Sequence, residues 1–190
     1  MIFSALLTAC GGGESTNSMQ ADTLSPTIAV AATKSSLIAA DTASLTFTLS
    51  EPSTNFIASD VSVTGGAVSG FTGSGTSYTA IFTPAANSTA NGVVSVANGV
   101  FTDAAGNANN DGADADNKVT FTVDTVIPTI AVTGAKSSLS IGETAALTFT
   151  LSEPSTNFIS SDVSVTGGSL TNFVGSGANY TAAFTLTASG

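Results

Sequence analysis

One stretch decides the fold of this chain, and it reads Leu45-Thr46-Phe47-Thr48-Leu49-Ser50-Glu51-Pro52-Ser53-Thr54-Asn55-Phe56-Ile57. In its first half, apolar Leu45, Phe47 and Leu49 alternate with hydroxylated residues. A period of two places these three side chains on one face of an extended strand. The stretch therefore predicts a β-strand with one buried and one solvated face.

The same stretch returns at Leu147–Ile159, at an offset of 102 (147 − 45). The offset also relates Asp22 to Asp124 and Tyr78 to Tyr180, so no gap is needed. Internal repeats of this kind mark an array of similar structural units. We therefore expect one unit over residues 22–127 and a second over 128–190.

The second copy ends at Gly190, which corresponds to Ser88 of the first copy. It has no counterpart of residues 89–123, which hold the last third of the first copy. We therefore expect the second unit to be incomplete and the sequence to be a fragment of a longer array.

Alternating apolar positions and glycine-containing turns continue through the whole first copy. Period-two pairs or triplets occur at 28/30, 45–49, 61/63, 78–82, 94/96 and 119–123. Turn dipeptides separate them at 65–66, 73–75, 91–92 and 98–99. About seven short strands in about 100 residues indicate an immunoglobulin-like β-sandwich. We expect an all-β fold with essentially no helix and a phenylalanine core made of Phe47, Phe56, Phe71, Phe82, Phe101 and Phe121.

Three segments of the first copy resemble bacterial Ig-like repeats: 45–51, 101–107, and 121–125 followed by Pro128. The resemblance covers residues 22–190. Such repeats occur in tandem in large surface adhesins and biofilm-associated proteins. The resemblance therefore implies a surface stalk, and it also implies calcium, because related repeats stiffen their inter-domain junctions with this ion.

The composition excludes several classes of function. The net charge is −10 (3 − 13) and the three basic residues are all lysines, which argues against a nucleic-acid partner. The absence of histidine removes the usual catalytic triads and the common imidazole metal ligand. A single cysteine excludes an intrachain disulfide, and without tryptophan no indole can stack a sugar beside a glycosidase carboxylate pair. We predict that the chain is not an enzyme.

The sequence begins with a short apolar run that ends in Leu7-Thr8-Ala9-Cys10 and is followed by three glycines. This run is too short to span a bilayer and resembles a bacterial lipobox behind a secretory signal. We expect residues 1–9 to be the last part of a signal peptide whose true start lies upstream. Cys10 is then the lipidated residue that partners the membrane, and residues 10–21 form a flexible tether. The alternative is a chance apolar N-terminus with a buried free cysteine.

Acidic residues gather where an Ig topology brings three segments to one pole. Asp22 lies in the linker before the first strand, Glu51 ends the second strand, and Asp103 and Asn107 belong to the loop between the sixth and seventh. Oxygen ligands of these types suit Ca²⁺. We therefore predict a calcium site there; the alternative is that Asp and Asn only make local turn contacts.

Two further acidic groups follow from the same reasoning. The second unit pairs Asp124 with Glu153 at the equivalent pole but lacks a loop aspartate. We expect this pair to bind calcium weakly or not at all in this chain. The stretch Asp111–Asp116 has no closing glutamate, and we interpret it as a solvated loop.

Together these features predict an adhesive structural lipoprotein at the outer membrane and cell surface. Two alternatives remain open at this level. One is a module that binds an extracellular glycan or protein, and the other is a spacer for a catalytic domain beyond residue 190.

Overall fold

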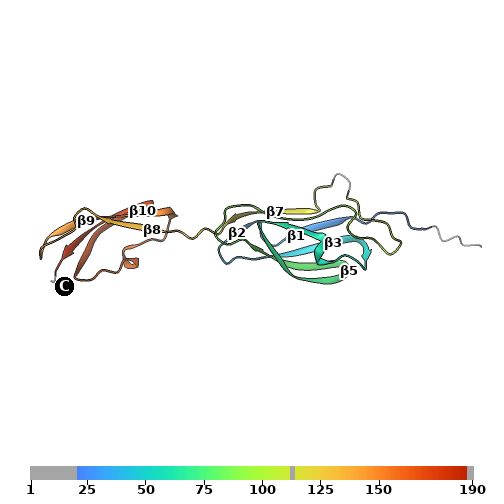
Figure 1. Ribbon diagram of the computed structural model, residues 1–190, viewed down its shortest axis with the longest axis horizontal. Coiled ribbons are helices and arrows are strands. Elements are labelled where there is room, and N and C mark those ends of the chain that lie inside the picture. Colours follow the sequence, from blue (N-terminus) through green and yellow to red (C-terminus); the bar gives the residue numbers. More distant parts are fainter. Residues whose placement is uncertain (1–20, 112–113, 188–190) are drawn as a thin grey trace, which may run out of the picture. The chain divides into compact units, whose positions relative to one another are not determined.

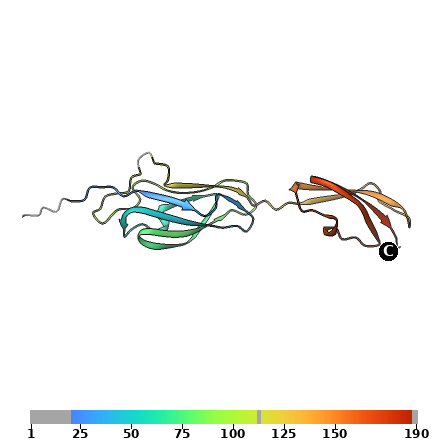
Figure 2. The same cartoon turned by 180° about the vertical axis from the view of Figure 1, so that it is seen from behind.

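The computed structural model describes residues 21–111 and 114–187. The chain forms two compact units that adjoin in sequence at Val123 and Asp124, and each is described by itself (Figure 1, and from behind in Figure 2).

The first unit is a sandwich of two sheets. One sheet has the order β1-β3-β5, from the strands β1 (Ile28–Ala32), β3 (Ala43–Ser53) and β5 (Gly66–Pro84). The other has the order β2-β7-β6-β4, from the strands β2 (Ser36–Ile38), β7 (Lys118–Asp124), β6 (Gly92–Val96) and β4 (Val61–Thr64). The predicted all-β, immunoglobulin-like fold is therefore confirmed.

Strand β3 shows why this sequence forms a sandwich. Leu45, Phe47 and Leu49 are buried, and the residues between them are exposed. In the register of the sheet, Phe47 lies between Val30 of β1 and Tyr78 of β5. Each fully buried side chain of this size stabilises the fold by about 1.5–3 kcal/mol. The apolar face of β3 is thus the centre of the core.

The predicted phenylalanine core is confirmed with one adjustment. Phe47, Phe56, Phe82, Phe101 and Phe121 are at most 3% exposed, whereas Phe71 is half-buried and packs against the edge of the cluster. The rings of Phe82 and Phe121 stack across the two sheets with centroids 4.5 Å apart.

The long element β5 doubles back on itself at the predicted glycine turn. A Cβ on Gly66 would lie 2.3 Å from the Thr83 carbonyl oxygen, and one on Gly73 would lie 2.3 Å from the Ser77 carbonyl oxygen. The two halves of β5 therefore face each other around residues 74–76. Gly73 has φ +143°, a conformation that only glycine adopts readily.

The second unit has one sheet of order β10-β9-β8. Its strands are β8 (Ile130–Gly134), β9 (Thr144–Ser155) and β10 (Gly168–Leu186). Its buried cluster is small, consisting of Phe149, Tyr180 and Ala182. Within residues 124–187, no strand corresponds to the second sheet of the first unit.

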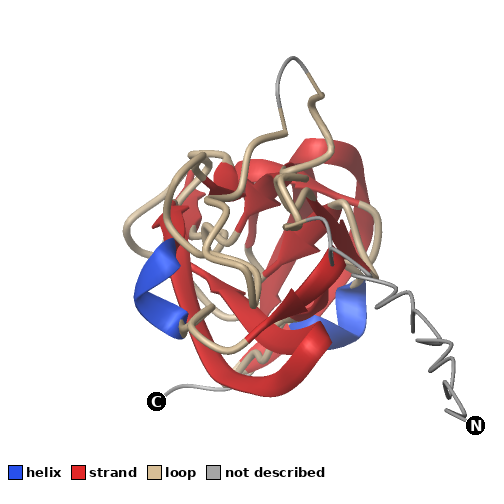
Figure 3. Ribbon diagram, turned by 90° about the vertical axis from the view of Figure 1, so that its right-hand side faces the viewer, coloured by secondary structure: helices blue, strands red, loops and turns tan. Residues whose placement is uncertain are grey.

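Helical structure within the described residues consists of two short 3-10 turns, η1 (Ala58–Asp60) and η2 (Ser160–Asp162), drawn in blue in Figure 3. In each turn an aspartate accepts a backbone hydrogen bond: Asp60 from Ile57 N at 2.9 Å, and Asp162 from Ile159 N at 3.0 Å. The expectation of essentially no helix is confirmed for this part of the chain. None of its helices is long and apolar enough to cross a membrane.

Candidate metal centre

Three carboxylates from distant parts of the sequence meet at one pole of the first unit. Asp22 precedes β1, Glu51 lies near the end of β3, and Asp103 belongs to the loop between β6 and β7. One carboxylate oxygen from each lies within 4.8 Å of the others. The sequence predicted that these three segments converge, and the structure brings all three side chains together.

Asp103 is the most firmly held of the three. It is 6% exposed, and its backbone forms an isolated antiparallel bridge with Ser53 of β3. Its Oδ1 accepts a hydrogen bond from Asn107 N at 2.8 Å, and its Oδ2 accepts one from Asn107 Nδ2 at 2.8 Å. The tight turn from 103 to 107 thus fixes the direction of the carboxylate.

Asn107, predicted to support the same site, lies beside Asp103 and Asp22. Its side-chain nitrogen donates to Asp103 and also, at 3.2 Å, to the backbone oxygen of Asp22. Asn107 therefore positions two of the carboxylate-bearing segments through its amide nitrogen. Asp22 is further held by its own turn, since its Oδ1 accepts a hydrogen bond from Leu24 N at 3.0 Å.

Glu51 is the carboxylate of this group whose negative charge is least favourably surrounded. Its pKa is raised by burial, then by the negative charges of Asp22 and Asp103 and by a hydrogen bond with the Asp103 side chain. Its Oε1 is buried and has no hydrogen-bond partner. For Asp103, burial raises the pKa, but hydrogen bonds from Asn107 and from the backbone of Gly106 and Ala105 outweigh it and lower the pKa overall.

These features fit a divalent cation. Three converging carboxylates repel one another, and a buried carboxylate oxygen without a partner is costly. The salt bridges of the described residues lie elsewhere: Lys34 pairs with Asp41 at 2.6 Å, and Lys136 pairs with Glu143. A hard cation that prefers oxygen ligands, such as Ca²⁺, would supply positive charge at this position.

The second unit carries only part of this arrangement. Asp124 repeats the local turn of Asp22, because its Oδ1 accepts a hydrogen bond from Val126 N at 3.4 Å. Glu153 lies in β9 at the position equivalent to Glu51. Among the described residues, an acidic group of three forms only at Asp22, Glu51 and Asp103. The repeat offset assigns no residue of this sequence to the counterpart of Asp103.

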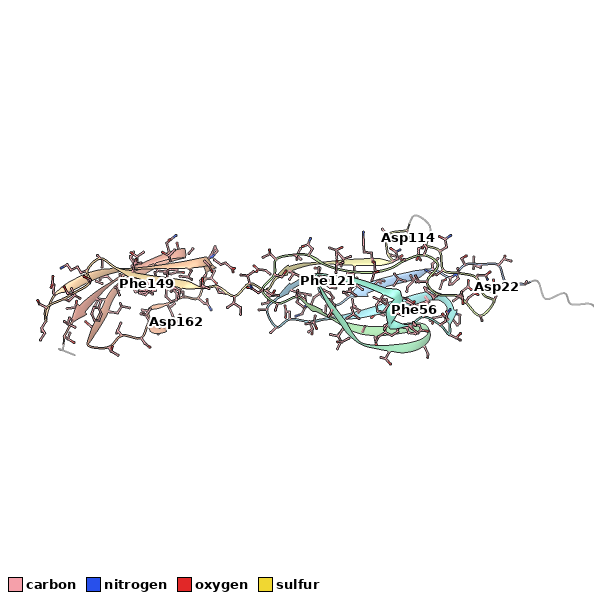
Figure 4. The ribbon with its side chains drawn as sticks, viewed as in Figure 1. Asp22, Phe56, Asp114, Phe121, Phe149 and Asp162 are labelled. Atoms are coloured by element: carbon pink, nitrogen blue, oxygen red, sulfur yellow. The ribbon has the colours of Figure 1, made fainter. Side chains whose placement is uncertain are left out.

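The interpretation of the Asp111–Asp116 stretch as a solvated loop is wrong for Asp111. This side chain is 7% exposed, and its Oδ1 accepts a hydrogen bond from Ile28 N at 2.6 Å. Its pKa is raised, chiefly by burial; the hydrogen bond from Ile28 lowers the pKa in part, and the negative charges of Asp116 and Asp114 add smaller increases. Asp114 and Asp116 are exposed as expected, and Figure 4 shows Asp114 on a loop away from Asp22.

Sequence reasoning missed one buried polar residue of this pole. Asn109 is 1% exposed; its Oδ1 accepts hydrogen bonds from Val100 N and Phe101 N, and its Nδ2 donates to Ala97 O at 2.9 Å. These hydrogen bonds stabilise the loop that contains Asp103. In the sequence it is one asparagine among several in a polar run, so no pattern singled it out.

The lipid-attachment residue predicted from the sequence, Cys10, lies outside the described residues. The structure therefore adds nothing to that prediction.

The repeated sequence and the immunoglobulin-like fold of the first unit define the class of this protein as a tandem array of Ig-like units. The profile of the family described as "Bacterial Ig-like domain" matches residues 22–123 and again 124–190. The chain belongs to this family.

Among solved structures, the chain is similar to FdeC, described as a broadly conserved Escherichia coli adhesin. The two share 18% sequence identity with a TM-score of 0.43, and the match covers 85% of this chain. It covers 56% of the FdeC chain, so this sequence spans little more than half of that structure. No curated protein matches the sequence.

Proposed function

We propose that this chain is a cell-surface protein whose Ig-like units act as non-catalytic structural and adhesive modules. The observation that carries the proposal is that one bacterial Ig-like family accounts for both units, and so for all but the first 21 residues. Units of this kind contact mainly their neighbours in an array and so suit an extended stalk. The partners of such a stalk are extracellular proteins or glycans.

The anchor in this proposal is lipid at Cys10, and the membrane is the outer membrane of a Gram-negative host. The support is the sequence alone: an apolar run, then Leu7-Thr8-Ala9-Cys10, then a glycine tract. More than one acyl chain is needed for firm attachment, because a single chain binds only marginally.

In the same proposal, Asp22, Glu51 and Asp103 hold one Ca²⁺ where the chain enters the first sandwich. The ion supplies positive charge between three carboxylates and gives the buried Glu51 Oε1 a partner. Asn107 supports the site, since its Nδ2 donates hydrogen bonds to Asp103 and to the backbone oxygen of Asp22. The bound ion thus ties the incoming segment to the end of β3 and to the β6–β7 loop.

The proposal is tested in cells that express the protein behind a functional upstream start. The wild type should be found in the outer-membrane fraction, should be cleaved by protease added to intact cells, and should increase cell attachment to a coated surface. Cys10→Ser should release the protein into the soluble fraction and abolish the gain in attachment. A protein that protease cannot reach on intact cells would overturn the surface assignment, and unchanged fractionation of Cys10→Ser would overturn the lipid anchor.

A further inference from the structure

A second polar feature of the first unit is a groove between the segment before β1 and the loop that joins β6 to β7. Its volume is about 500 Å³. Its lining includes one serine, Ser25, and four asparagines, Asn98, Asn107, Asn109 and Asn110. Among the described residues, no charged side chain lines it. This amide groove is therefore a neutral surface of hydrogen-bonding groups.

The side chains of the amide groove are already oriented by hydrogen bonds within the fold. Asn109 is 1% exposed, and its amide is bonded to three backbone groups. Asn98 Oδ1 accepts a hydrogen bond from Asp111 N at 3.1 Å, and Asn98 Nδ2 donates one to Asn110 Oδ1 at 3.3 Å. A ligand therefore meets side chains that need little further ordering, which lowers the entropic cost of binding.

Three groups of the groove remain available after these internal bonds. An amide nitrogen carries two hydrogens, and Asn98 Nδ2 uses one of them. Asn107 Nδ2 uses both, toward Asp103 and Asp22, whereas its Oδ1 accepts no hydrogen bond from the described residues. The hydroxyl of Ser25 likewise has no hydrogen-bond partner in the described part of the chain. The groove thus offers a donor, an acceptor and a group that can act as either.

These groups suit a polyhydroxylated ligand better than a polypeptide. The backbone N–H groups of the loop are used within the fold, since Gly99 N donates to Asn109 O at 2.9 Å and Asn110 N donates to Pro26 O at 3.0 Å. Strand addition needs free backbone groups, and peptide side chains need apolar pockets as anchors. The described lining supplies neither, because Ala108 is its one apolar side chain. A hydroxyl both donates and accepts, so it can satisfy each of the three available groups.

Charge narrows the ligand further. Asp103 and Asp111 belong to the same loop as the asparagines, and Asp22 lies in the segment before β1. The whole chain has a net charge of −10. This field repels anionic sugars such as uronic acids, whereas a neutral sugar meets no such penalty.

We propose that the amide groove binds a neutral glycan, whose hydroxyls bond to Asn98 Nδ2, Asn107 Oδ1 and Ser25 Oγ. The inference rests on the proposed function and names the partner class of its adhesive module. None of the described residues that line the groove is aromatic, so one site holds its sugar weakly, with a Kd in the millimolar range. Many copies on one cell surface raise the avidity.

The test is a titration of the isotope-labelled full chain with maltotriose, cellotriose and tri-N-acetylchitotriose, each to tens of millimolar, followed by heteronuclear NMR in calcium chloride. At least one of these neutral trisaccharides should shift the side-chain amide signals of Asn98 and Asn107 saturably. Trigalacturonate, which is anionic, should bind at least about tenfold more weakly.

Three variants locate the binding. Ala108→Leu places a larger apolar side chain in the groove and should weaken binding at least about tenfold. Ala104→Leu is its matched control and should have no effect, because Ala104 is exposed in the same loop but does not line the groove. Ser25→Ala should weaken binding about threefold, since it removes a hydroxyl that the fold does not use. Unchanged core signals show that each variant is folded.

Failure of any neutral trisaccharide to shift these signals, equal binding of trigalacturonate, or full binding by Ala108→Leu would each overturn the proposal. Shifts produced by the blocked peptide acetyl-triserine amide, and not by the sugars, would assign the groove to a polypeptide and overturn it as well. The proposed function fails separately, because loss of protease cleavage on intact cells would leave sugar binding by the purified chain unchanged.

Discussion

Residues 22–88 and 124–190 of this protein have closely similar sequences, but their apolar side chains are buried to very different extents. In the first unit, Phe47 belongs to a core cluster that draws on both sheets. In the second unit, the buried cluster around its counterpart Phe149 consists of three residues. Strand formation and pairing are nonetheless alike, since Val132 pairs with Phe149 just as Val30 pairs with Phe47. The comparison separates two levels: alternation and turns are enough to form a sheet, but only a second sheet turns its apolar face into a core.

The largest expected difference concerns autonomous folding. A fragment of residues 22–127 should unfold in one cooperative thermal transition, because it contains both sheets and a closed core. A fragment of residues 128–190 should show none, because one three-stranded sheet leaves apolar surface and strand edges exposed. Circular dichroism during heating measures both. A sharp transition for the 128–190 fragment would contradict the contrast drawn above.

A single equivalent position should show the next largest difference. Phe82 is fully buried and stacks on Phe121, whereas its counterpart Phe184 is half-buried. Phe82→Ala should therefore cost about 3–5 kcal/mol of unfolding free energy in the first unit. Phe184→Ala should reduce hydrogen-exchange protection in the second unit far less, because its side chain is already partly exposed and the unit lacks a closed core. Hydrogen exchange of the full chain in increasing urea, resolved by peptide, assigns each loss to its unit. Equal losses would show that the second core is closed in solution.

Calcium should distinguish the poles of the two units. The melting temperature of the 22–127 fragment should rise with calcium, since binding to the folded state alone stabilises it by about 2.7 kcal/mol at 100 times the Kd. Asp103→Ala should abolish the rise, and Asp114→Ala should preserve it. In the full chain, Asp124→Ala should not change the response. A melting temperature independent of calcium would leave Asp22, Glu51 and Asp103 as ordinary turn and strand residues.

The smallest expected effect is a pH dependence of the metal-free first unit. Burial and the negative charges of Asp22 and Asp103 raise the pKa of Glu51 in the folded state above its usual value of 4.5. Between that value and the raised pKa, the folded state binds more protons than the unfolded state, so stability increases as pH falls through this window. Glu51→Gln should therefore stabilise the unit at neutral pH in EDTA, and this gain should shrink as pH falls toward 4.5.

Its matched control is Glu153→Gln in the full chain, because the second unit brings no third carboxylate to that position. Urea unfolding at several pH values measures both substitutions. A Glu51→Gln gain that grows on acidification would refute the assignment of the raised pKa. Asp103 acts in the opposite sense, since its lowered pKa contributes stability that is lost as pH falls below 3.8.

Much of the fold could be predicted from the sequence because its signals are local. The alternation in β3 and the glycines at the turn of β5 each act within a few residues, and the structure has both as predicted. The convergence of Asp22, Glu51 and Asp103 followed from topology, since an Ig sandwich brings those three segments to one pole.

The rest depended on contacts that leave no pattern in the sequence. Asp111 accepts a hydrogen bond from the backbone N–H of Ile28, which lies 83 residues away in the sequence. Nothing in the acidic sequence around Asp111 distinguished it from Asp114. Asn107 was correctly placed at the pole, but the direction in which its amide points depends on the turn that Asp103 and Gly106 form.

The hydrogen bonds that join the two ends of the first unit also determine when this unit can complete its folding. Ile28 N donates to Asp111, Asn107 Nδ2 to the Asp22 carbonyl, and Thr122 N to the Ser35 carbonyl, across 83, 85 and 87 residues. Because a chain is synthesised from its N-terminus, β1, β3 and β5 emerge from the ribosome well before their partners near residues 101–124. The nascent unit must therefore persist as a half-covered sheet, exposed to aggregation and proteolysis, until its last strand arrives. Chaperones that shield apolar sheet faces are most needed during that interval.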